Sequence, residues 1–465
     1  MMTLKIAFRN ILRNRRRSMM TLLAIAVGAV GIVLFGEFVR FVTAGLETSA
    51  VDKVGHLTVF RRGYFAFGAG NPAEFGIDDY AGVVRAIRED PVLAPRLNVV
   101  TPIVSLAGIA GNFDVDASKT FLGTGVVPSE RDRLSRWDEH GVSRRRVLRE
   151  SGLRDDDEAR GIVGVGLARV LGLCERLRIG DCPARPAAPR ATGARLDGAL
   201  AGLAQADGVA VAAAKGNEPP RLDLLAATAG GAPNVVSLAV SRAEPQGVRE
   251  LDDNFVAMHI NLAQKLVYGR SEPKATGIVV QLRHTGDLAM ARARLGALFA
   301  ERHLDLELRD FAELQPFYKQ AVGMFRAIFA FISLIMSVIV LFTVVNTMGM
   351  SVMERTTEIG SARAMGVRRS GIRRLFVVEG AILGAIGATI GAALAQAIAT
   401  AVNHAGMTWT PPGQAAPIPL EILTAGSTGL VLRVWLALLV AATLAALIPA
   451  NRGARLPVVD ALRHV

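Results

Sequence analysis

The uncharged run AIFAFISLIMSVIVLFTVV, Ala327–Val345, contains only apolar and small hydroxyl residues. A helix needs about 20 predominantly apolar residues to cross the roughly 30 Å hydrocarbon core of a bilayer, and this run meets that requirement. The whole chain of 465 residues is 51% hydrophobic and has a positive mean hydropathy of +0.35. Such a composition argues against a string of soluble domains and excludes a disordered chain. The sequence therefore predicts an integral membrane protein.

Three further stretches have the same character. Ser18–Gly36 and Gly380–Val402 are uncharged and apolar, and the shorter Val434–Ala450 is preceded by the uncharged Ile422–Leu432. We predict four transmembrane α-helices, with a large α+β extracytoplasmic domain inserted between the first and the second. The predicted membrane helices are 18–45, including the start of a stalk, then 321–348, 375–402 and 430–450.

The first stretch could instead be a cleaved signal peptide, with Arg15–Arg17 as its basic region. The uncharged run is long for that role, and no clear small-x-small cleavage site precedes a polar mature start. Apolar residues also continue beyond it at helical spacing. We therefore expect a retained membrane helix.

Basic residues are distributed unevenly along the chain. The excess of Lys and Arg over Asp and Glu in three short segments, 1–17, 349–374 and 451–465, equals the whole net charge of +12. The loop 403–429 has no Lys or Arg. Cytoplasmic loops carry such an excess, so we expect a multi-pass protein of the bacterial cytoplasmic membrane with both termini in the cytoplasm. Because topology explains the charge, we expect no nucleic-acid partner.

The segment 46–320 has mixed secondary-structure signals. Residues rich in β-branched types predict strands at His56–Phe60, Val99–Ile109 and Gly277–Leu282. Amphipathic spacing predicts helices at Asp78–Glu89 and Gly286–Glu301. We expect an α+β domain with more than one lobe. A stretch rich in Ala, Pro, Gly and Arg, Cys182–Pro220, is interpreted as a long loop or linker.

Apolar residues at helical spacing flank this domain on both sides. We predict that they extend the first two membrane helices outward as a stalk, although ordinary amphipathic helices packed on the domain would show the same pattern. Pro316 places the start of the second helix near itself, because Pro is tolerated in a first turn. The stalk positions are Phe38, Phe41, Val42, Leu46, Tyr318 and Val322.

No catalytic, cofactor-binding or metal-binding constellation is recognisable in the sequence. The P-loop pattern GxxxxGK[ST] and the HExxH pattern do not occur, and the seven histidines are scattered. The acidic run Asp155–Glu158 lacks EF-hand spacing and is interpreted as a solvated loop. Cys174 and Cys182 would share the oxidising side and could form a disulfide.

The third predicted membrane helix has features that favour close helix packing. Small residues at spacings of three and four allow helix backbones to approach, within the chain or across a dimer. They are Gly380, Gly384, Gly387 and Gly391. Glu379 begins this helix near Arg373 and Arg374, where a structural ion pair is a better interpretation than a proton relay.

A resemblance to a known family rests on four segments. The loop MERTTEIGSARAMG, residues 353–366, resembles the ERTxEIGxxRAxG signature of FtsX-type ABC transporter permeases, the group that includes MacB and LolC/LolE. The ending PANRGARLPVVDALR, 449–463, resembles theirs but departs at Gly453 and has Pro457 one position early. AFRNILRNRRR, 7–17, resembles their amphipathic N-terminal helix. GIVGVGLARVLGL, 161–173, more loosely resembles a motif of the MacB-like periplasmic domain.

The resemblance implies a permease that forms a dimer, with a second copy or with a related permease, and docks two copies of a separate ABC ATPase. ATP and Mg would be bound by that ATPase, and this chain would be neither an enzyme nor a cofactor protein. The implied docking residues are Glu354, Arg355, Glu358, Ile359, Gly360, Arg363, Ala364 and Gly366. Alternatively, the arginines of this loop would only set the orientation of the chain in the membrane.

The resemblance to family members of this topology implies mechanotransmission, in which closure of the ATPase moves a stalk and a periplasmic domain. The moved substrate would be a released lipoprotein, or a hydrophobic or periplasmic molecule passed toward an outer-membrane partner. The competing hypotheses are a membrane-anchored periplasmic ligand sensor, a wall-hydrolase activator acting through a partner, and an anchored periplasmic enzyme. The sequence does not identify the substrate.

Overall fold

The structure is a computed structural model of the chain. It describes residues 2–68, 70–142, 151–180, 182, 219–247, 249–409, 418–424 and 426–458. The predicted linker Cys182–Pro220 and the end of the predicted tail 451–465 fall largely outside these residues. The chain divides into two compact units. Unit 1 comprises Met1–Gly45, Lys319–Trp409 and Ile418–Val465, and unit 2 is formed by Leu46–Tyr318.

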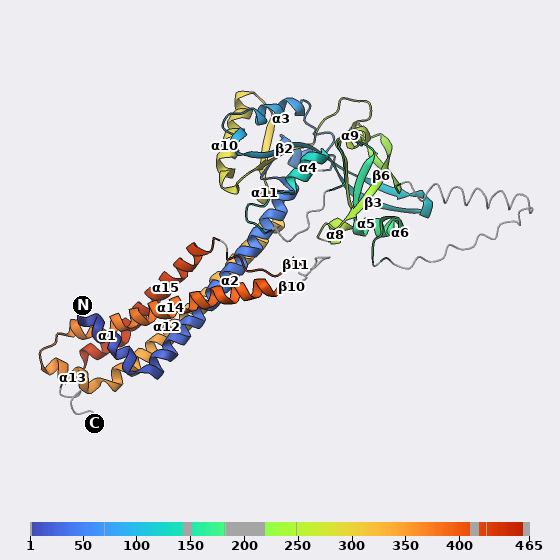
Figure 1. The fold of residues 1–465 in the computed structure, drawn as a ribbon. Coiled ribbons are helices and arrows are strands. Elements are labelled where there is room, and N and C mark those ends of the chain that lie inside the picture. Colours follow the sequence, from blue (N-terminus) through green and yellow to red (C-terminus); the bar gives the residue numbers. More distant parts are fainter. Residues whose placement is uncertain are drawn as a thin grey trace, which may run out of the picture. The chain divides into compact units, whose positions relative to one another are not determined.

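Unit 1 is helical (Figure 1). Four of the described helices are long and apolar enough to cross a membrane. They are α2 (Arg15–Val54), α12 (Pro316–Glu354), α14 (Arg369–Ala405) and α15 (Thr428–Arg455). The remaining elements are α1 (Met2–Arg13), α13 (Thr356–Ala364), β10 (Thr408–Trp409) and β11 (Ile418–Pro419). All four predicted apolar stretches lie in these long helices, and α12 begins at Pro316 as expected.

The long helices bury one face against each other and leave another apolar face exposed. Ile25 of α2, Val340 of α12, Phe376 of α14 and Leu438 of α15 belong to one buried cluster. Phe342, on the opposite face of α12, remains largely exposed. In water such a surface would be unfavourable, but in a bilayer it contacts lipid chains.

Unit 2 contains a nine-stranded sheet that closes partly on itself. Its order is β3-β7-β4-β6-β5-β2-β8-β1-β9, and an additional β3–β2 pairing joins the first six strands into a barrel. The strands are β1 (Leu57–Arg61), β2 (Leu97–Asn112), β3 (Ala117–Val126), β4 (Arg160–Gly164), β5 (Arg221–Ala227), β6 (Pro233–Glu244), β7 (Phe255–His259), β8 (Gly277–Leu282) and β9 (Leu306–Asp310).

Helices cover the two parts of this sheet. The described helices of unit 2 are η1 (Tyr64–Gly68), α3 (Tyr80–Arg88), η2 (Ala94–Arg96), η3 (Phe113–Val115), α4 (Pro128–Leu134), α5 (Val165–Val170), α6 (Cys174–Leu177), α8 (Arg249–Asp252), α9 (Ile260–Tyr268), η5 (Thr285–Asp287), α10 (Leu288–Glu301) and α11 (Phe311–Leu314). Residues of α3 and α10 form one hydrophobic cluster with β1, β2 and β8, and residues of α5 and α9 form a second cluster with the barrel strands. Unit 2 therefore has two lobes, and the long strand β2 contributes to both.

The elements predicted in unit 2 are present with small shifts at their ends. The predicted strand Val99–Ile109 is longer in the structure, Leu97–Asn112, and the helix predicted at Asp78–Glu89 is Tyr80–Arg88. Asp79 is its N-cap, and its side chain accepts a hydrogen bond of 2.9 Å from the backbone N–H of Gly82. Cys174 and Cys182 form a disulfide.

Candidate functional site

The segment carrying the permease signature folds into a short helix with a defined end. Thr356 begins α13 where α12 stops, and its hydroxyl donates a 2.7 Å hydrogen bond to the carbonyl of Met353. At the other end, Val367 N–H donates to Ala362 O at 3.1 Å and Gly366 N–H donates to Arg363 O at 3.0 Å. This is a Schellman motif, and Gly366 supplies the positive φ of 95° that it requires. Gly366 therefore ends the helix.

A buried ion pair joins the start of α13 to two other helices. Arg355 Nη1 lies 3.1 Å from Glu379 Oε1 of α14, and the two side chains are only 7% and 4% exposed. Asn10 of α1 donates from its side chain to the same Glu379 oxygen at 2.6 Å and accepts at its backbone carbonyl from Arg355 at 3.2 Å. The expected structural ion pair of Glu379 is present, but its partner is Arg355 and not Arg373 or Arg374.

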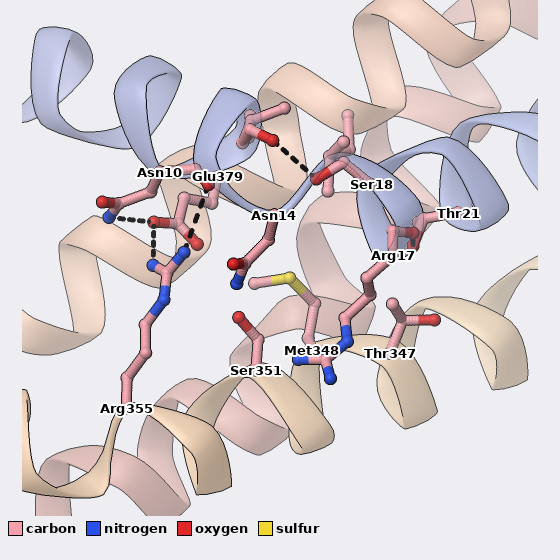
Figure 2. Close-up of a pocket in the computed structure, with 12 residues that line it drawn as sticks. Asn10, Asn14, Arg17, Ser18, Thr21, Thr347, Met348, Ser351, Arg355 and Glu379 are labelled. Carbon is pink, nitrogen blue, oxygen red and sulfur yellow. Dashed lines mark hydrogen bonds and ion pairs between the residues drawn. The ribbon is translucent and has the colours of Figure 1, made fainter.

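A small polar cavity lies beside this ion pair (Figure 2). It encloses about 20 Å³, which is enough for one water molecule. Among the described residues, Arg355 Nε and Arg17 Nη1 lack a hydrogen-bond partner, and both arginines line the cavity. The cavity is therefore part of a polar junction lined by residues of α1, α2, α12 and α14.

Two further contacts hold α13 against its neighbours, and a third joins α2 to the end of α12. Arg13 of α1 donates to both carboxylate oxygens of Glu358, at 2.6 and 2.9 Å, in an exposed pair. Arg17 of α2 pairs with Glu354 at the end of α12. Arg363 donates to the carbonyls of Leu456 and Ala454 at 2.9 and 3.3 Å, where the end of α15 leaves carbonyl groups without intrahelical partners.

The predicted docking residues therefore differ in accessibility. Arg355, Ile359 and Gly360 are buried, so they can serve docking only by holding α13 in place and not by touching a partner. Ala364 and Gly366 are exposed. The sequence interpretation missed Met365 and Val367, which flank Gly366 and are 80% and 42% exposed. Two apolar residues around a helix-ending glycine are the signal that could have identified them.

The predicted packing glycines contact helices of the same chain. A Cβ added at Gly380 or Gly384 would lie within 2.8 Å of alanine side chains of α15. At Gly387 or Gly391 it would meet α2, and at Gly391 it would lie 2.5 Å from the carbonyl oxygen of Ala26. These four glycines allow both α15 and α2 to pack closely against one face of α14.

The predicted stalk residues lie on two long helices. Phe41 and Val322 are buried, whereas Phe38, Val42 and Leu46 are half-buried on the continuous helix α2. Tyr318, in the first turn of α12, packs its ring 5.1 Å from that of Phe311.

A family model described as FtsX-like permease C-terminal matches residues 330–458, which contain most of α12 and all of α13, α14 and α15. This region is an FtsX-like permease domain. The resemblance expected from the signature loop is thereby confirmed for this domain, and the chain is similar to ABC transporter permeases of the FtsX, MacB and LolC type. The domain match and the four long apolar helices of the described chain support a location in the bacterial inner membrane.

Similarity to curated proteins is partial. The chain is 32% identical over 114 residues to the macrolide export ATP-binding/permease protein MacB of Escherichia coli, covering 24% of this chain and 18% of MacB. It is 28% identical over 238 residues to MacB of Hyphomonas neptunium, covering 50% and 34%. It is 27% identical over 190 residues to the lipoprotein-releasing system transmembrane protein LolC of Neisseria meningitidis, covering 39% and 43%. The matches thus span less than half of each relative.

Proposed function

We propose that this permease couples ATP hydrolysis by a separate ABC ATPase to movement of unit 2 on the extracytoplasmic side of the membrane. The observation that carries the proposal is the short helix α13. It presents an exposed apolar tip, Met365 and Val367, while its other contacts anchor it to α1, α14 and α15.

These two properties suit a docking element. An exposed apolar side chain at a fixed helix end can enter a pocket on a partner and become a hot spot of the interface. The anchoring contacts then carry any displacement of α13 to α1, α14 and α15, because each is a direct hydrogen bond or ion pair. Two long helices, α2 and α12, would pass the movement on to the residues of unit 2.

The names of the relatives suggest two classes of substrate for the proposed transporter. One relative is a macrolide exporter with its own ATP-binding part, and the other belongs to a lipoprotein-releasing system. Within our proposal this chain releases a lipoprotein or exports a hydrophobic or periplasmic molecule. It would act as a dimer, with a second copy or a related permease, and with two copies of the ATPase that bind ATP and Mg.

The orientation proposed here places α13 and both termini in the cytoplasm. The chain's two cysteines are paired in a disulfide, so a cysteine introduced at exposed Ser361 would be the single free thiol. We expect a membrane-impermeant maleimide to label Ser361→Cys only after the cells are permeabilised. Labelling in intact cells would show that the orientation is the opposite of the one proposed.

The docking role is tested by capture of the P-loop ATPase that co-purifies with the tagged chain. Met365→Glu should weaken this association on the order of 30-fold, because loss of a hot-spot contact costs about 2 kcal/mol. Charge reversal at both anchors, Glu358→Lys with Arg363→Glu, should also reduce capture by misplacing α13. Phe113→Glu, a similarly exposed apolar position in unit 2, is the control and should leave capture unchanged. Wild-type capture by both loop variants would show that α13 is not the dock.

A further inference from the structure

Helix α1 has three distinct faces, of which unit 1 covers one. Ala7 and Ile11 are buried, and Asn10 on the same side contacts Glu379 of α14. Leu4, Phe8 and Leu12 repeat at intervals of four residues and are 58%, 49% and 51% exposed. Residues at this spacing share one helix face, so they form a continuous uncovered apolar stripe.

Basic residues border this stripe. Lys5 and Arg9 each directly follow a stripe residue and are exposed. Within the described part of the chain, neither has a carboxylate partner, whereas Arg13 and Arg17 further along are paired with Glu358 and Glu354. Residues 2–13 include no Asp or Glu. The charges of Lys5 and Arg9 are therefore available to an external anion.

The position of α1, directly before the first apolar helix α2, indicates which surroundings the apolar stripe contacts. α1 ends at Arg13, and α2 begins at Arg15 with exposed apolar side chains at Met19, Met20 and Leu23. These belong to the exposed surface of a helix that is long and apolar enough to span a membrane. The stripe therefore lies beside the point at which the chain enters the bilayer. A helix with an apolar face and a basic edge at that level lies in the membrane interface.

We propose that α1 is a binding site for anionic phospholipid, in which Leu4, Phe8 and Leu12 contact the acyl chains while Lys5 and Arg9 hold the phosphate headgroup. Basic residues next to a bilayer surface are attracted to anionic lipids. Since α1 is bonded to Glu379 and to α13, a lipid bound there stabilises the position of both elements. The proposal concerns the permease alone and does not rest on ATPase docking.

The test uses the full chain in nanodiscs made of equal parts phosphatidylglycerol and phosphatidylcholine, with a photoreactive group introduced as Phe8→p-benzoylphenylalanine. After illumination, mass spectrometry of the crosslinked chain gives the ratio of the two lipids bound at the stripe. We expect phosphatidylglycerol to be enriched over the bulk mixture. Lys5→Gln with Arg9→Gln should lower that enrichment, by up to about 30-fold for two charges.

Two controls separate charge from folding. Lys5→Arg with Arg9→Lys keeps both charges and should keep the enrichment, and Arg85→Gln with Arg270→Gln removes two exposed charges from unit 2 and should have no effect. High salt should reduce the enrichment in the unmodified chain, because salt screens the attraction between Lys5, Arg9 and the headgroup. This measurement tests the role of charge even if the glutamine variant does not insert into the nanodisc. Crosslinking in proportion to the bulk lipids, or to protein only, would overturn the proposal.

Discussion

Arg355 makes the buried polar contacts that join the signature loop to α1 and α14. Its guanidinium bonds to Glu379 of α14 and to the backbone of Asn10 in α1, and both ionised side chains are almost fully buried. Removal of one member of a buried pair leaves an unpaired charge in a low-dielectric site, which is more costly than removal of both.

We therefore expect Arg355→Ala to lower the free energy of unfolding by about 3–5 kcal/mol. The double variant Arg355→Met with Glu379→Met should be less destabilised than the sum of its single changes, because no lone charge remains. Thermal unfolding of the purified chain in detergent measures all four proteins of this cycle. Additive losses would show that the two side chains do not act as a pair.

The partner of Glu379 illustrates where sequence reasoning stops. Arg373 and Arg374 were the expected partners because they are close in sequence and lie about one and a half turns away on the same helix. The structure selects Arg355, which comes from the other end of the loop. The break between α12 and α13 turns this residue inward, and nothing in the signature motif encodes the direction of that turn.

At the scale of elements, α14 shows what spacing can and cannot predict. Four glycines at intervals of three and four define a close-packing face, and this face was evident from the sequence. The sequence did not identify the helices that pack on this face, because a dimer contact and a contact within the chain require the same small residues. In the structure Gly380 and Gly384 face α15 while Gly387 and Gly391 face α2. All four glycines lie on one face of α14, so α15 and α2 contact this face at different levels along the helix.

A buried histidine lies near the start of β1 in unit 2. His56 accepts at Nδ1 from the backbone N–H of Leu282 at 3.0 Å, so in its neutral form it donates from Nε2 to Thr285 Oγ1 at 3.1 Å. Its ring packs edge-on against that of Trp137, with centroids 4.9 Å apart. Burial lowers the pKa of His56 to about 4, although Glu47 and Glu139 oppose this shift.

The lowered pKa predicts how the stability of unit 2 depends on pH. An unfolded histidine has a pKa near 6.5, so between about pH 6.5 and 4 the unfolded chain binds more protons than the folded one. The free energy of unfolding should therefore fall as pH falls through this window, by on the order of 3 kcal/mol at pH 4. Nearby His140 acts oppositely, since the Glu47 carboxylate, 3.4 Å from its Nε2, raises its pKa.

The measurement is thermal unfolding of the full chain followed by tryptophan fluorescence over this pH range. His56→Gln removes the titrating group and should flatten the decline, while His303→Asn, at an exposed position, should leave it unchanged. If His56→Gln declines as steeply as the unmodified chain, other groups cause the pH dependence.

For the whole molecule, the sequence predicted the membrane helices and the lobed α+β domain but not the barrel. Apolar runs and β-branched stretches are local signals, and they identified α12, β8 and β2 with small shifts at their ends. Closure of the barrel depends on pairings between distant segments, such as the parallel pair β3–β7, which aligns Leu122 with Phe255. Strand pattern alone does not encode which strands meet.

The coupling proposal can be tested most directly by a change in helix α2. It runs without a break from Arg15 to Val54, so that its first part belongs to unit 1 and its last turns belong to unit 2. A continuous helix resists bending because each turn is hydrogen-bonded to the next. If α2 transmits movement, one interruption in its middle should separate the two activities of the assembled transporter.

We predict that Val42→Pro uncouples ATP hydrolysis from substrate release. Proline removes a backbone donor and clashes with the preceding turn, at a cost of about 3 kcal/mol in a helix interior. Val42 is half-buried in the interior of α2, about three turns before its end. Because α13 with its anchoring contacts is remote from it in sequence, the basal ATPase of the reconstituted complex should persist. Release of a purified lipoprotein, measured in the same preparation, should fall sharply, whereas Val42→Ala should behave like the unmodified chain. Normal release from an assembled Val42→Pro complex would mean that α2 is passive, and the mechanical proposal would fail.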